Sequence, residues 1–504
     1  MAEASRTTAT TVMEETQESD AKDILQERFV LLSSGKEQDV KLLASTIQYS
    51  PVGAPRTKGK VILLQDIIGV QCMKGKVLTD QRAYLTIYVY PRGRTITGSI
   101  DARRCRVVLV FVVASSVVFT DNLQKASLWR EAILALLRPI SVCAHYSRRW
   151  LVLINPAGGP GKAVKLFQER VLPIFSEAEI NFDTVISERA GHVGEIVRSL
   201  NLDRYSAVIL VSGDGLIYEA INGLMERADW RRAIKTPLGL IPAGSGNALA
   251  ASIHQACGEP FSHDFVKHAA LLLTRCIPQP LDLLYVQSLT SQRYAFLSFG
   301  WGIIADIDIE SEKFRKLGEN RFTVGALQRV LDLRSYGGKL SYLPADESNA
   351  WLAAPEVDIA ASGDYVNVPS RPATNLLVPL CCPLPDSWIS VEGQFISVYV
   401  TLTSRIAASS VAVPWAQLND GLGYLCWVKG GLPKTAVTSF LLNLSTGDHL
   451  KSPYVQMVAI RAFRLEPRDK DGIMTIDGER IQYGPVQGQM LPSMARVLTR
   501  YDGH

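Results

Sequence analysis

Val208-Ile-Leu-Val-Ser-Gly-Asp214-Gly215 is an apolar run that ends in a carboxylate between two glycines. A short β-branched run of this kind is typical of a strand buried in a parallel sheet. The segment from Leu216 to Leu224 has the apolar pattern of a helix that starts at once. Ligands of open α/β sheets lie at the carboxyl ends of the strands. The stretch therefore predicts a parallel α/β sheet and places Asp214 where chemistry takes place.

The same pattern extends in both directions from this stretch. Strands are predicted at 150–155, 182–186, 207–211 and 238–242, with helices at 163–178 and 192–200. Beyond 281 the strands follow one another at irregular spacing, at 281–286, 294–299, 395–402 and 424–428. We expect an α/β catalytic lobe at 148–278 and a β-rich, sandwich-like substrate lobe at 279–500, with a surface insertion near 344–385.

The segment 28–145 has an all-β pattern closed by one helix. Strands are predicted at 29–32, 60–64, 84–90 and 107–119, and a helix that contains Trp129 at 122–137. This order resembles a pleckstrin-homology-like (PH-like) β-barrel module. Two interpretations of its basic residues stay open, a surface for anionic lipid and ordinary solvated charge. These basic residues are Arg92, Arg94, Arg103, Arg104 and Arg106.

Composition sets limits on the class of protein. A chain of 504 residues predicts two or three domains, and a formal charge of +4 does not suggest a nucleic-acid partner. The eight cysteines contain no Cys-x-x-Cys pair, so neither a zinc site nor a disulfide framework is indicated. Residues 1–27 lack the apolar core of a signal peptide and predict a disordered tail. The valine-rich run 107–119 is too short to span a bilayer as a helix. We expect a cytoplasmic protein with peripheral membrane contact.

Two further glycine-rich loops each follow a predicted strand. Backbone N–H groups at such a loop, beside a helix N-terminus, suit phosphate. Either loop alone could be a tight turn or a helix cap, and neither has Walker A or dinucleotide-binding spacing. Three glycine-bearing strand ends in one α/β lobe favour a nucleotide. The two loops are Asn155-Pro-Ala-Gly158-Gly159-Pro-Gly161-Lys162 and Pro242-Ala-Gly244-Ser245-Gly246-Asn247.

The stretch from Ser298 to Phe322 carries acids and then bases. A calcium loop is discounted because Ser311 stands where that loop needs glycine. Asp308 and Glu312 could form a solvated helical face. Alternatively, a carboxylate here holds a cationic head group while Arg315 and Arg321 reach phosphates. Further on, Asp477-Gly478-Glu479 is a hairpin signature whose Glu479 could point at a metal or at Asp214.

Taken in order, these motifs resemble those of the sphingosine kinases, within the lipid-kinase superfamily that also contains diacylglycerol and ceramide kinases. The resemblance runs from about Arg148 to Pro492, with an interruption near 346–383. It rests on Ser212-Gly-Asp-Gly-Leu, Pro242-Ala-Gly-Ser-Gly-Asn-Ala-Leu-Ala, Ala305-Asp-Ile-Asp-Ile-Glu-Ser-Glu-Lys-Phe-Arg and Asp477-Gly-Glu. The segment Tyr88-Val-Tyr-Pro-Arg-Gly-Arg94 is more similar to the longer animal type.

The resemblance implies ATP and magnesium between two lobes and a sphingoid base in an apolar pocket. Asp214 would be the general base, with the magnesium ion held through the ATP phosphates and its protein ligands left open. Ser298 and Asp308 would contact the lipid head, and Ile303, Ile304 and Phe322 the tail. The implied nucleotide contacts are Asn155, Gly158, Gly159, Gly161, Lys162, Ser187, Ser212, Gly213, Gly215, Glu219, Gly244, Ser245, Gly246, Asn247, Arg315, Arg321, Asp477, Gly478 and Glu479.

One departure from the family pattern lies in the first loop, where Ala157 and Pro160 replace larger or basic residues and Pro160 removes a donor. The alternatives are a ceramide or diacylglycerol kinase, or an inactive membrane-binding relative. Asp308 favours sphingosine or dihydrosphingosine, because a free ammonium attracts a carboxylate and a neutral amide or ester does not. The oligomeric state, the target membrane, regulation by phosphorylation and the preference among bases stay open.

Overall fold

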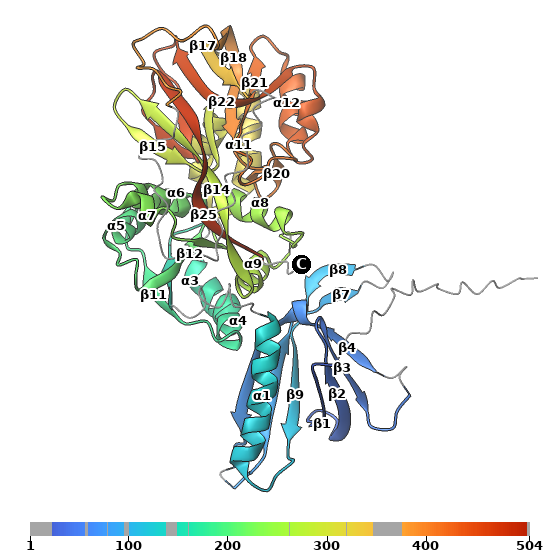
Figure 1. The fold of residues 1–504 in the computed structure, drawn as a ribbon. Helices are drawn as coiled ribbons and strands as arrows, with labels where there is room; N and C mark the ends of the chain where they lie inside the picture. Colours follow the sequence, from blue (N-terminus) through green and yellow to red (C-terminus); the bar gives the residue numbers. More distant parts are fainter. Residues whose placement is uncertain are drawn as a thin grey trace, which may run out of the picture. The chain divides into compact units, whose positions relative to one another are not determined.

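The structure, a computed structural model, describes residues 23–55, 59–77, 79–94, 100–137, 149–159, 161–261, 263–318, 320–345 and 375–500. Contacts divide the chain into two compact units, each of which is considered by itself (Figure 1). The first unit comprises residues 1–91 and 105–137, and the second comprises 92–104 and 138–504. Residues 92–104 therefore belong to the second unit, although they lie inside the predicted N-terminal module.

The first unit is an antiparallel sheet of seven strands in the order β4-β3-β2-β1-β9-β6-β5, with one long helix. The disordered tail predicted over residues 1–27 extends too far along the chain, because Leu25 already pairs with Leu42 in the sheet. The Trp129 ring packs edge-on against Phe29 at 5.2 Å, which fixes the helix on the sheet. The elements are β1 (Leu25–Leu31), β2 (Lys36–Leu42), β3 (Thr46–Pro51), β4 (Lys60–Leu63), β5 (Ile67–Lys74), β6 (Ala83–Val89), β9 (Val107–Val113) and α1 (Phe119–Leu137).

The second unit is built on one 14-stranded sheet. Its N-terminal part has β10 (Arg149–Ile154), α3 (Ala163–Leu166), α4 (Leu172–Glu177), β11 (Phe182–Ile186), α5 (His192–Ser199), β12 (Tyr205–Ser212), α6 (Asp214–Met225), α7 (Trp230–Ala233), β13 (Leu238–Pro242), α8 (Ala248–Ala256) and α9 (Phe265–Leu273). Its C-terminal part has β14 (Cys276–Ser288), β15 (Gln292–Ala295), β16 (Ser298–Gly302), α10 (Ile303–Glu310), α11 (Asn320–Leu331), β17 (Tyr336–Pro344), β18 (Ile389–Thr401), β21 (Gly423–Lys429), α12 (Lys434–Asn443), β22 (Val455–Pro467), β23 (Met474–Ile476), β24 (Glu479–Ile481) and β25 (Val486–Arg500).

The predicted parallel α/β arrangement is confirmed. Strands β11, β10, β12 and β13 lie side by side in that order, and all their pairings are parallel. The residues of β10, β12 and β13 are almost fully buried, as expected for strands covered by helices on both faces, whereas the edge strand β11 is partly exposed. Parallel pairing brings the carboxyl ends of β10, β12 and β13 to one edge, where the three glycine-rich loops begin.

The β-rich part continues the same sheet, because β13 pairs with β25 and β25 pairs with β14 and β22. Strands β18 and β22 each pair with β17 along one half and with β21 along the other. The four strands therefore form a closed ring of pairings around an apolar core that includes Trp301 and Phe463. Residues 346–374 of the predicted insertion lie outside the described residues.

A hairpin of β7 (Arg92–Arg94) and β8 (Ile100–Arg104) lies in the second unit. The Arg104 guanidinium contacts the Glu259 carboxylate at 2.8 Å, and both side chains are buried. Arg92 and Arg500 also pair with Glu259, which follows the C-terminal end of α8. The proposal that Arg104 faces anionic lipid is therefore wrong, since its charge is taken up by a buried carboxylate. No helix in the described part of the chain combines the length and apolar character needed to cross a bilayer.

Candidate active site

Asp214 is the first residue of α6. It lies just beyond the carboxyl end of β12 and is buried. Its carboxylate accepts hydrogen bonds from two backbone N–H groups at the start of α8, those of Ala248 at 2.7 Å and Leu249 at 3.3 Å. A helix N-terminus provides such donors and a favourable dipole end. The N-terminal end of α8 therefore fixes the orientation of the Asp214 carboxylate.

The three glycine-rich loops meet beside Asp214. A Cβ atom on Gly213 would lie 2.4 Å from the carbonyl oxygen of Gly246, and one on Gly244 would lie 2.3 Å from the Cα of Gly213. A Cβ on Gly159 would lie 2.9 Å from the carbonyl carbon of Gly244, and Gly159 itself has a φ of +52°. Side chains at these positions would separate the loops. The glycines are thus required for close approach of backbone to backbone.

Several of the predicted nucleotide contacts hold these loops in shape. Asn155 Oδ1 accepts the Ala157 N–H at 3.0 Å, and Asn247 bonds both backbone groups of Gly244. Ser187 is buried and donates its N–H to the carbonyl of Ile154, so it lies beside the first loop. Ser212 and Ser245 are also buried in this region, and Lys162 is exposed at the start of α3. Pro160 lies outside the described residues.

Glu219 lies on α6, one and a half turns beyond Asp214. Its Oε2 atom is buried and has no hydrogen-bond partner among the described residues. A buried acceptor without a donor is costly, by about 1–3 kcal/mol. The position is therefore consistent with a ligand that brings a donor, such as a hydroxyl group.

The predicted Asp477-Gly478 hairpin is confirmed, and the Asp477 side chain also binds backbone N–H groups of another segment. Both residues have positive φ, as a type I′ turn between β23 and β24 requires. The Asp477 carboxylate accepts backbone N–H groups from Phe296, Leu297 and Ser298 at 2.8–3.0 Å. Both of its oxygens are thus engaged by the chain. Asp477 therefore positions the start of β16.

Glu479 begins β24, immediately after this turn. Its Oε1 atom would lie 2.9 Å from a Cβ placed on Gly215, the residue after Asp214. The hairpin therefore brings the Glu479 carboxylate against the first turn of α6, as the sequence suggested. Among the described residues, no group of three or more His, Cys, Asp or Glu side chains could hold a metal ion.

Ser298 and Asp308 both lie near the phenol of Tyr399. Tyr399 bonds to Ser298, and its pKa is raised well above the usual range by burial and by the carboxylates of Asp308, Asp477 and Asp214. Burial also raises the pKa of Asp308 to about 7, with a further contribution from Asp214. Each carboxylate thus lies within electrostatic reach of the others, and a cation bound among them would be stabilised.

Arg321 is buried on α11, and its guanidinium pairs with the Glu312 carboxylate. It also stacks over the Phe322 ring at 4.3 Å, and its Nε has no hydrogen-bond partner in the described part of the chain. The Nε–H group is thus a donor that the pair with Glu312 does not engage. The side chain of Arg315 lies outside the described residues.

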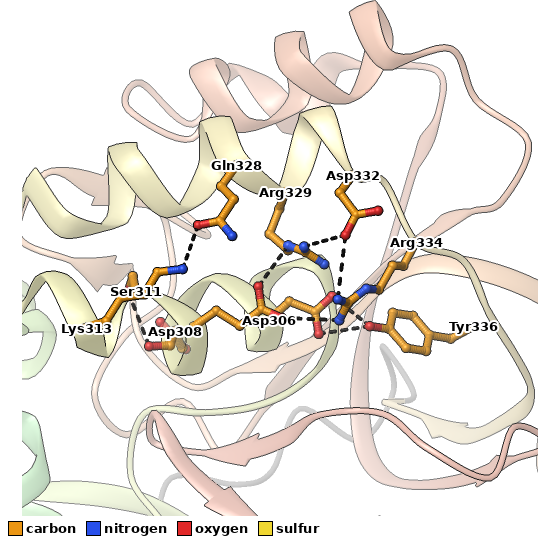
Figure 2. Close-up of polar contacts among 10 residues, drawn as sticks. Asp306, Asp308, Ser311, Lys313, Gln328, Arg329, Asp332, Arg334 and Tyr336 are labelled. Atoms are coloured by element: carbon orange, nitrogen blue, oxygen red, sulfur yellow. Dashed lines mark hydrogen bonds and ion pairs between the residues drawn. The ribbon is translucent and has the colours of Figure 1, made fainter.

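A polar network fastens α10, which carries Asp308, to α11 and β17 (Figure 2). The Tyr336 hydroxyl lies 2.9 and 2.7 Å from the two oxygens of Asp306, whose pKa is raised by burial to about 6. Buried Arg329 on α11 pairs with Glu310 on α10 at 2.9 Å. The helix that carries Asp308 is therefore held at both its first and its last turn.

Ile303, Ile304 and Phe322 belong to one apolar cluster formed by α10, α11 and α12 against β18 and β21, as the prediction of a tail pocket requires. A narrow cavity of about 20 Å³ opens inside it. Its lining includes Ile304, Tyr399, Phe440, Leu444 and His449. A long alkyl chain would need these helices to move apart, because the free space is far smaller than a lipid tail.

Sequence reasoning missed Tyr399 and the whole of α12. The signal for Tyr399 was present, since Ser397, Tyr399 and Thr401 alternate with apolar residues in the second half of β18 and share one face. No comparable signal marked α12, whose apolar positions can be understood only against the cluster that it covers.

The sequence of this chain is similar to those of known proteins. Residues 149–284 match the model of the diacylglycerol kinase catalytic domain. Human sphingosine kinase 2 is 31% identical over 89% of this chain and 86% of its own length. Human sphingosine kinase 1 is 40% identical over 68% of this chain and 89% of its own length. The chain belongs to the sphingosine kinase family.

Sphingosine kinases are lipid kinases, and the diacylglycerol kinase catalytic domain matches the part of the chain that carries the three glycine-rich loops. Sphingosine kinase 1 of Arabidopsis thaliana is 37% identical over 67% of this chain and 69% of its own length. A solved structure of a putative diacylglycerol kinase from Bacillus anthracis aligns with a TM-score of 0.50 at 17% identity. It covers 70% of this chain and 97% of its own, and it shows the fold alone.

Proposed function

We propose that this sphingosine kinase transfers the γ-phosphoryl group of ATP to the primary hydroxyl of sphingosine or dihydrosphingosine. The observation that carries the proposal is the arrangement around Tyr399. There, Asp214 at the glycine-rich loops lies within electrostatic reach of Asp308, a carboxylate beside an apolar cluster. A nucleotide phosphate and an aminated lipid can thus meet at one acid.

In the proposed reaction Asp214 accepts the proton of the lipid hydroxyl as its oxygen attacks the γ-phosphorus. The new P–O bond forms while the bond between the γ-phosphorus and the β,γ-bridging oxygen breaks, and ADP leaves. The two N–H bonds from α8 orient the carboxylate before the substrate arrives. Such catalysis rests on positioning and on neutralising the charge of the phosphates.

The nucleotide side is supported by the convergence of three glycine-rich loops and by the buried acceptor on Glu219, which suits a hydroxyl of the ribose. Magnesium prefers one or two carboxylates together with phosphates. Glu479 fits that role from its place against Gly215. Bound magnesium would supply charge neutralisation at the phosphates.

The assignment of the lipid substrate is supported by the Asp308 carboxylate and by the apolar cluster that α10, α11 and α12 form. Asp308 matches an ammonium group, which would lower the raised pKa of this carboxyl and keep it ionised. The apolar cluster around Ile304 and Phe440 matches an alkyl chain. Ceramide and diacylglycerol carry no ammonium and would make no ion pair with Asp308.

The experiment is a phosphate-transfer assay with radiolabelled ATP on sphingosine, dihydrosphingosine, ceramide and diacylglycerol, each with and without magnesium. Labelled product from the two free bases, dependent on magnesium, is expected. A preference for ceramide or diacylglycerol would overturn the substrate assignment. No transfer to any of the four lipids would favour an inactive membrane-binding relative.

We further propose that the first unit is a PH-like module and that the protein is a cytoplasmic enzyme that visits anionic membranes. The strand order β4-β3-β2-β1-β9-β6-β5 and the terminal helix with Trp129 support the first point. Exposed Arg103 and Arg106 support the second. Co-sedimentation of the full chain with vesicles of neutral lipid, with and without phosphatidylserine, tests membrane binding.

A further inference from the structure

A cavity of about 430 Å³ lies away from the catalytic residues, over β14, β15 and β25. Met225, the last residue of α6, lines it, whereas Asp214 is the first residue of that helix. Met225 lies eleven residues beyond Asp214 along the helix, a separation of about 17 Å. The cavity is therefore distinct from the phosphate-transfer site, and its volume is in the range of small-molecule sites.

The floor of the cavity is formed by residues paired across three strands. Tyr285 of β14 lies between Tyr294 of β15 and Gln489 of β25. Two residues further along β14, Gln287 faces Gln292 of β15. Residues two apart share one face of a sheet, so aromatic rings and amides alternate over the same surface. The Tyr285 and Tyr294 rings are 5.6 Å apart.

Three amides of the lining are oriented by their neighbours. Gln489 Oε1 accepts the Leu376 N–H at 3.0 Å, and Asn375 Oδ1 accepts the Leu377 N–H at 3.2 Å. Since a backbone N–H can only donate, the acceptor in each pair must be the amide oxygen.

The same reasoning fixes Gln287. Arg464 donates to Gln487 Oε1 at 3.0 and 2.8 Å, so the Gln487 nitrogen must be the atom that donates to Gln287 Oε1 at 3.0 Å. In these three of the four lining amides the oxygen is thus engaged by the protein, and the NH₂ group is the donor that each can offer a ligand.

The walls add a large aromatic surface without charge. Trp230 lines the cavity together with apolar residues, and the described lining includes no Asp, Glu, Lys, Arg or His. Arg231 stacks on the Trp230 ring at 5.4 Å but is not part of the lining. The apolar members are Met225, Leu377, Val378, Pro379, Leu491 and Met494.

We propose that this cavity is a second ligand site for an uncharged, flat aromatic molecule that carries carbonyl oxygens. The rings of Trp230, Tyr285 and Tyr294 supply stacking surface. The oriented NH₂ groups of Gln287, Asn375 and Gln489 supply donors that a carbonyl oxygen satisfies. A charged ligand would find no counter-ion in the lining and would lose its hydration.

The test uses three probes of one shape and different charge, namely 2-naphthamide, 2-naphthoate and 2-naphthylmethylamine, with saturation-transfer NMR on the full chain. Transfer to 2-naphthamide is expected, and it should persist when ATP and sphingosine are both present. Equal transfer to all three probes would overturn the proposal, as would displacement of 2-naphthamide by sphingosine or ATP.

Two variants locate the binding. Trp230→Ala should weaken 2-naphthamide binding about threefold to tenfold, the range for one aromatic contact. Gln292→Ala, at the exposed edge of the cavity, should weaken 2-naphthamide binding less than Trp230→Ala does. This variant tests the site if Trp230→Ala folds poorly. The matched controls Trp415→Ala and Gln456→Ala alter exposed residues outside the lining. Unchanged binding in both Trp230→Ala and Gln292→Ala would refute the assignment.

Discussion

The Oδ2 atom of Asp214 accepts a hydrogen bond of 2.7 Å from the backbone nitrogen of Ala248, 34 residues further along the chain. This bond joins the end of β12 to the start of α8. It therefore connects the proposed base directly to the glycine-rich loop that precedes α8. A carboxylate that is already oriented loses little freedom when the substrate binds.

Asp214→Asn should abolish phosphate transfer and keep the fold. The amide cannot take a proton, so turnover should fall by about 10²–10⁴-fold, the usual contribution of a general base. Its single oxygen can replace only one of the two bonds from α8, at a cost of about 1 kcal/mol in the free energy of unfolding. Turnover and denaturant unfolding measure the two effects. Exposed Asp386→Asn is the control, and wild-type turnover in Asp214→Asn would remove Asp214 from the role of base.

The KM for sphingosine should rise as the pH falls below about 7, because Asp308 then becomes protonated and no longer attracts the ammonium. In the free protein, Asp308 makes the free energy of unfolding fall as the pH rises, whereas an acid in a salt bridge makes it rise. The folded state keeps this proton up to about pH 7 while the unfolded chain releases it near 3.8. The contribution of Asp308 to the free energy of unfolding therefore falls as the pH rises between these values.

Asp308→Asn tests both statements, since it removes the titrating group. Its KM for sphingosine should be high and nearly independent of pH on either side of 7, while the wild-type value varies. Denaturant unfolding across the same pH range should show a flatter dependence in the variant. A wild-type KM that does not change across pH 7 would contradict the proposed pairing.

Leu444→Phe should shift the preference of the enzyme toward shorter bases. Leu444 lines the narrow cavity of the apolar cluster, and the larger ring removes space from a tail. We expect KM for an 18-carbon base to rise about tenfold, the effect of one or two misfitting carbons, and KM for a 12-carbon base to change little. Leu442→Phe alters an exposed neighbour on the same helix and should change neither. Equal effects on the two chain lengths would place the tail elsewhere.

Tyr336→Phe removes the donor from the buried Asp306 carboxylate and should loosen α10 (Figure 2). An unsatisfied buried acceptor costs about 1–3 kcal/mol of stability. Because Asp308 lies on the same helix, KM for sphingosine should rise while KM for ATP stays near the wild-type value. Exposed Tyr454→Phe serves as the control. If both KM values rose together, Tyr336 would support the whole unit rather than the lipid side.

Glu259→Gln should destabilise the second unit strongly. The substitution leaves the buried guanidinium of Arg104, and that of Arg500 beside it, without their shared carboxylate. Loss of one partner from a buried ion pair costs about 3–5 kcal/mol. Glu195→Gln breaks an exposed pair with Arg189 and should barely change the unfolding midpoint. Equal midpoints for the two variants would show that the cluster is unimportant for stability.

The parallel sheet could be predicted because its signals are local. Each strand is a short apolar run, and each following glycine is required by contacts that form at the same sheet edge, as Gly213 and Gly244 illustrate. The position of Asp214 followed from this pattern alone. Long-range contacts had no such signal. Nothing near Ser298 in the sequence indicates that Asp477, 179 residues away, would hold its backbone.

The absence of a local signal for long-range contacts also explains why the prediction of a lipid contact for Arg104 was wrong. For the same reason, the predicted phosphate contact of Arg321 did not include its pair with Glu312. Their positive charge is visible in the sequence, but the carboxylates that take it up, Glu259 and Glu312, can be identified only once the chain is folded. Charge can be counted from a sequence, whereas burial depends on packing that the sequence does not state locally.

The two-residue turn at Asp477-Gly478 couples the two sides of the proposed site. On one side of the turn Asp477 holds the strand that carries Ser298, and on the other Glu479 rests against Gly215. The length of this turn therefore sets where the Glu479 carboxylate lies relative to Ser298. A single inserted residue would displace one from the other and so change the separation between the proposed nucleotide and lipid contacts.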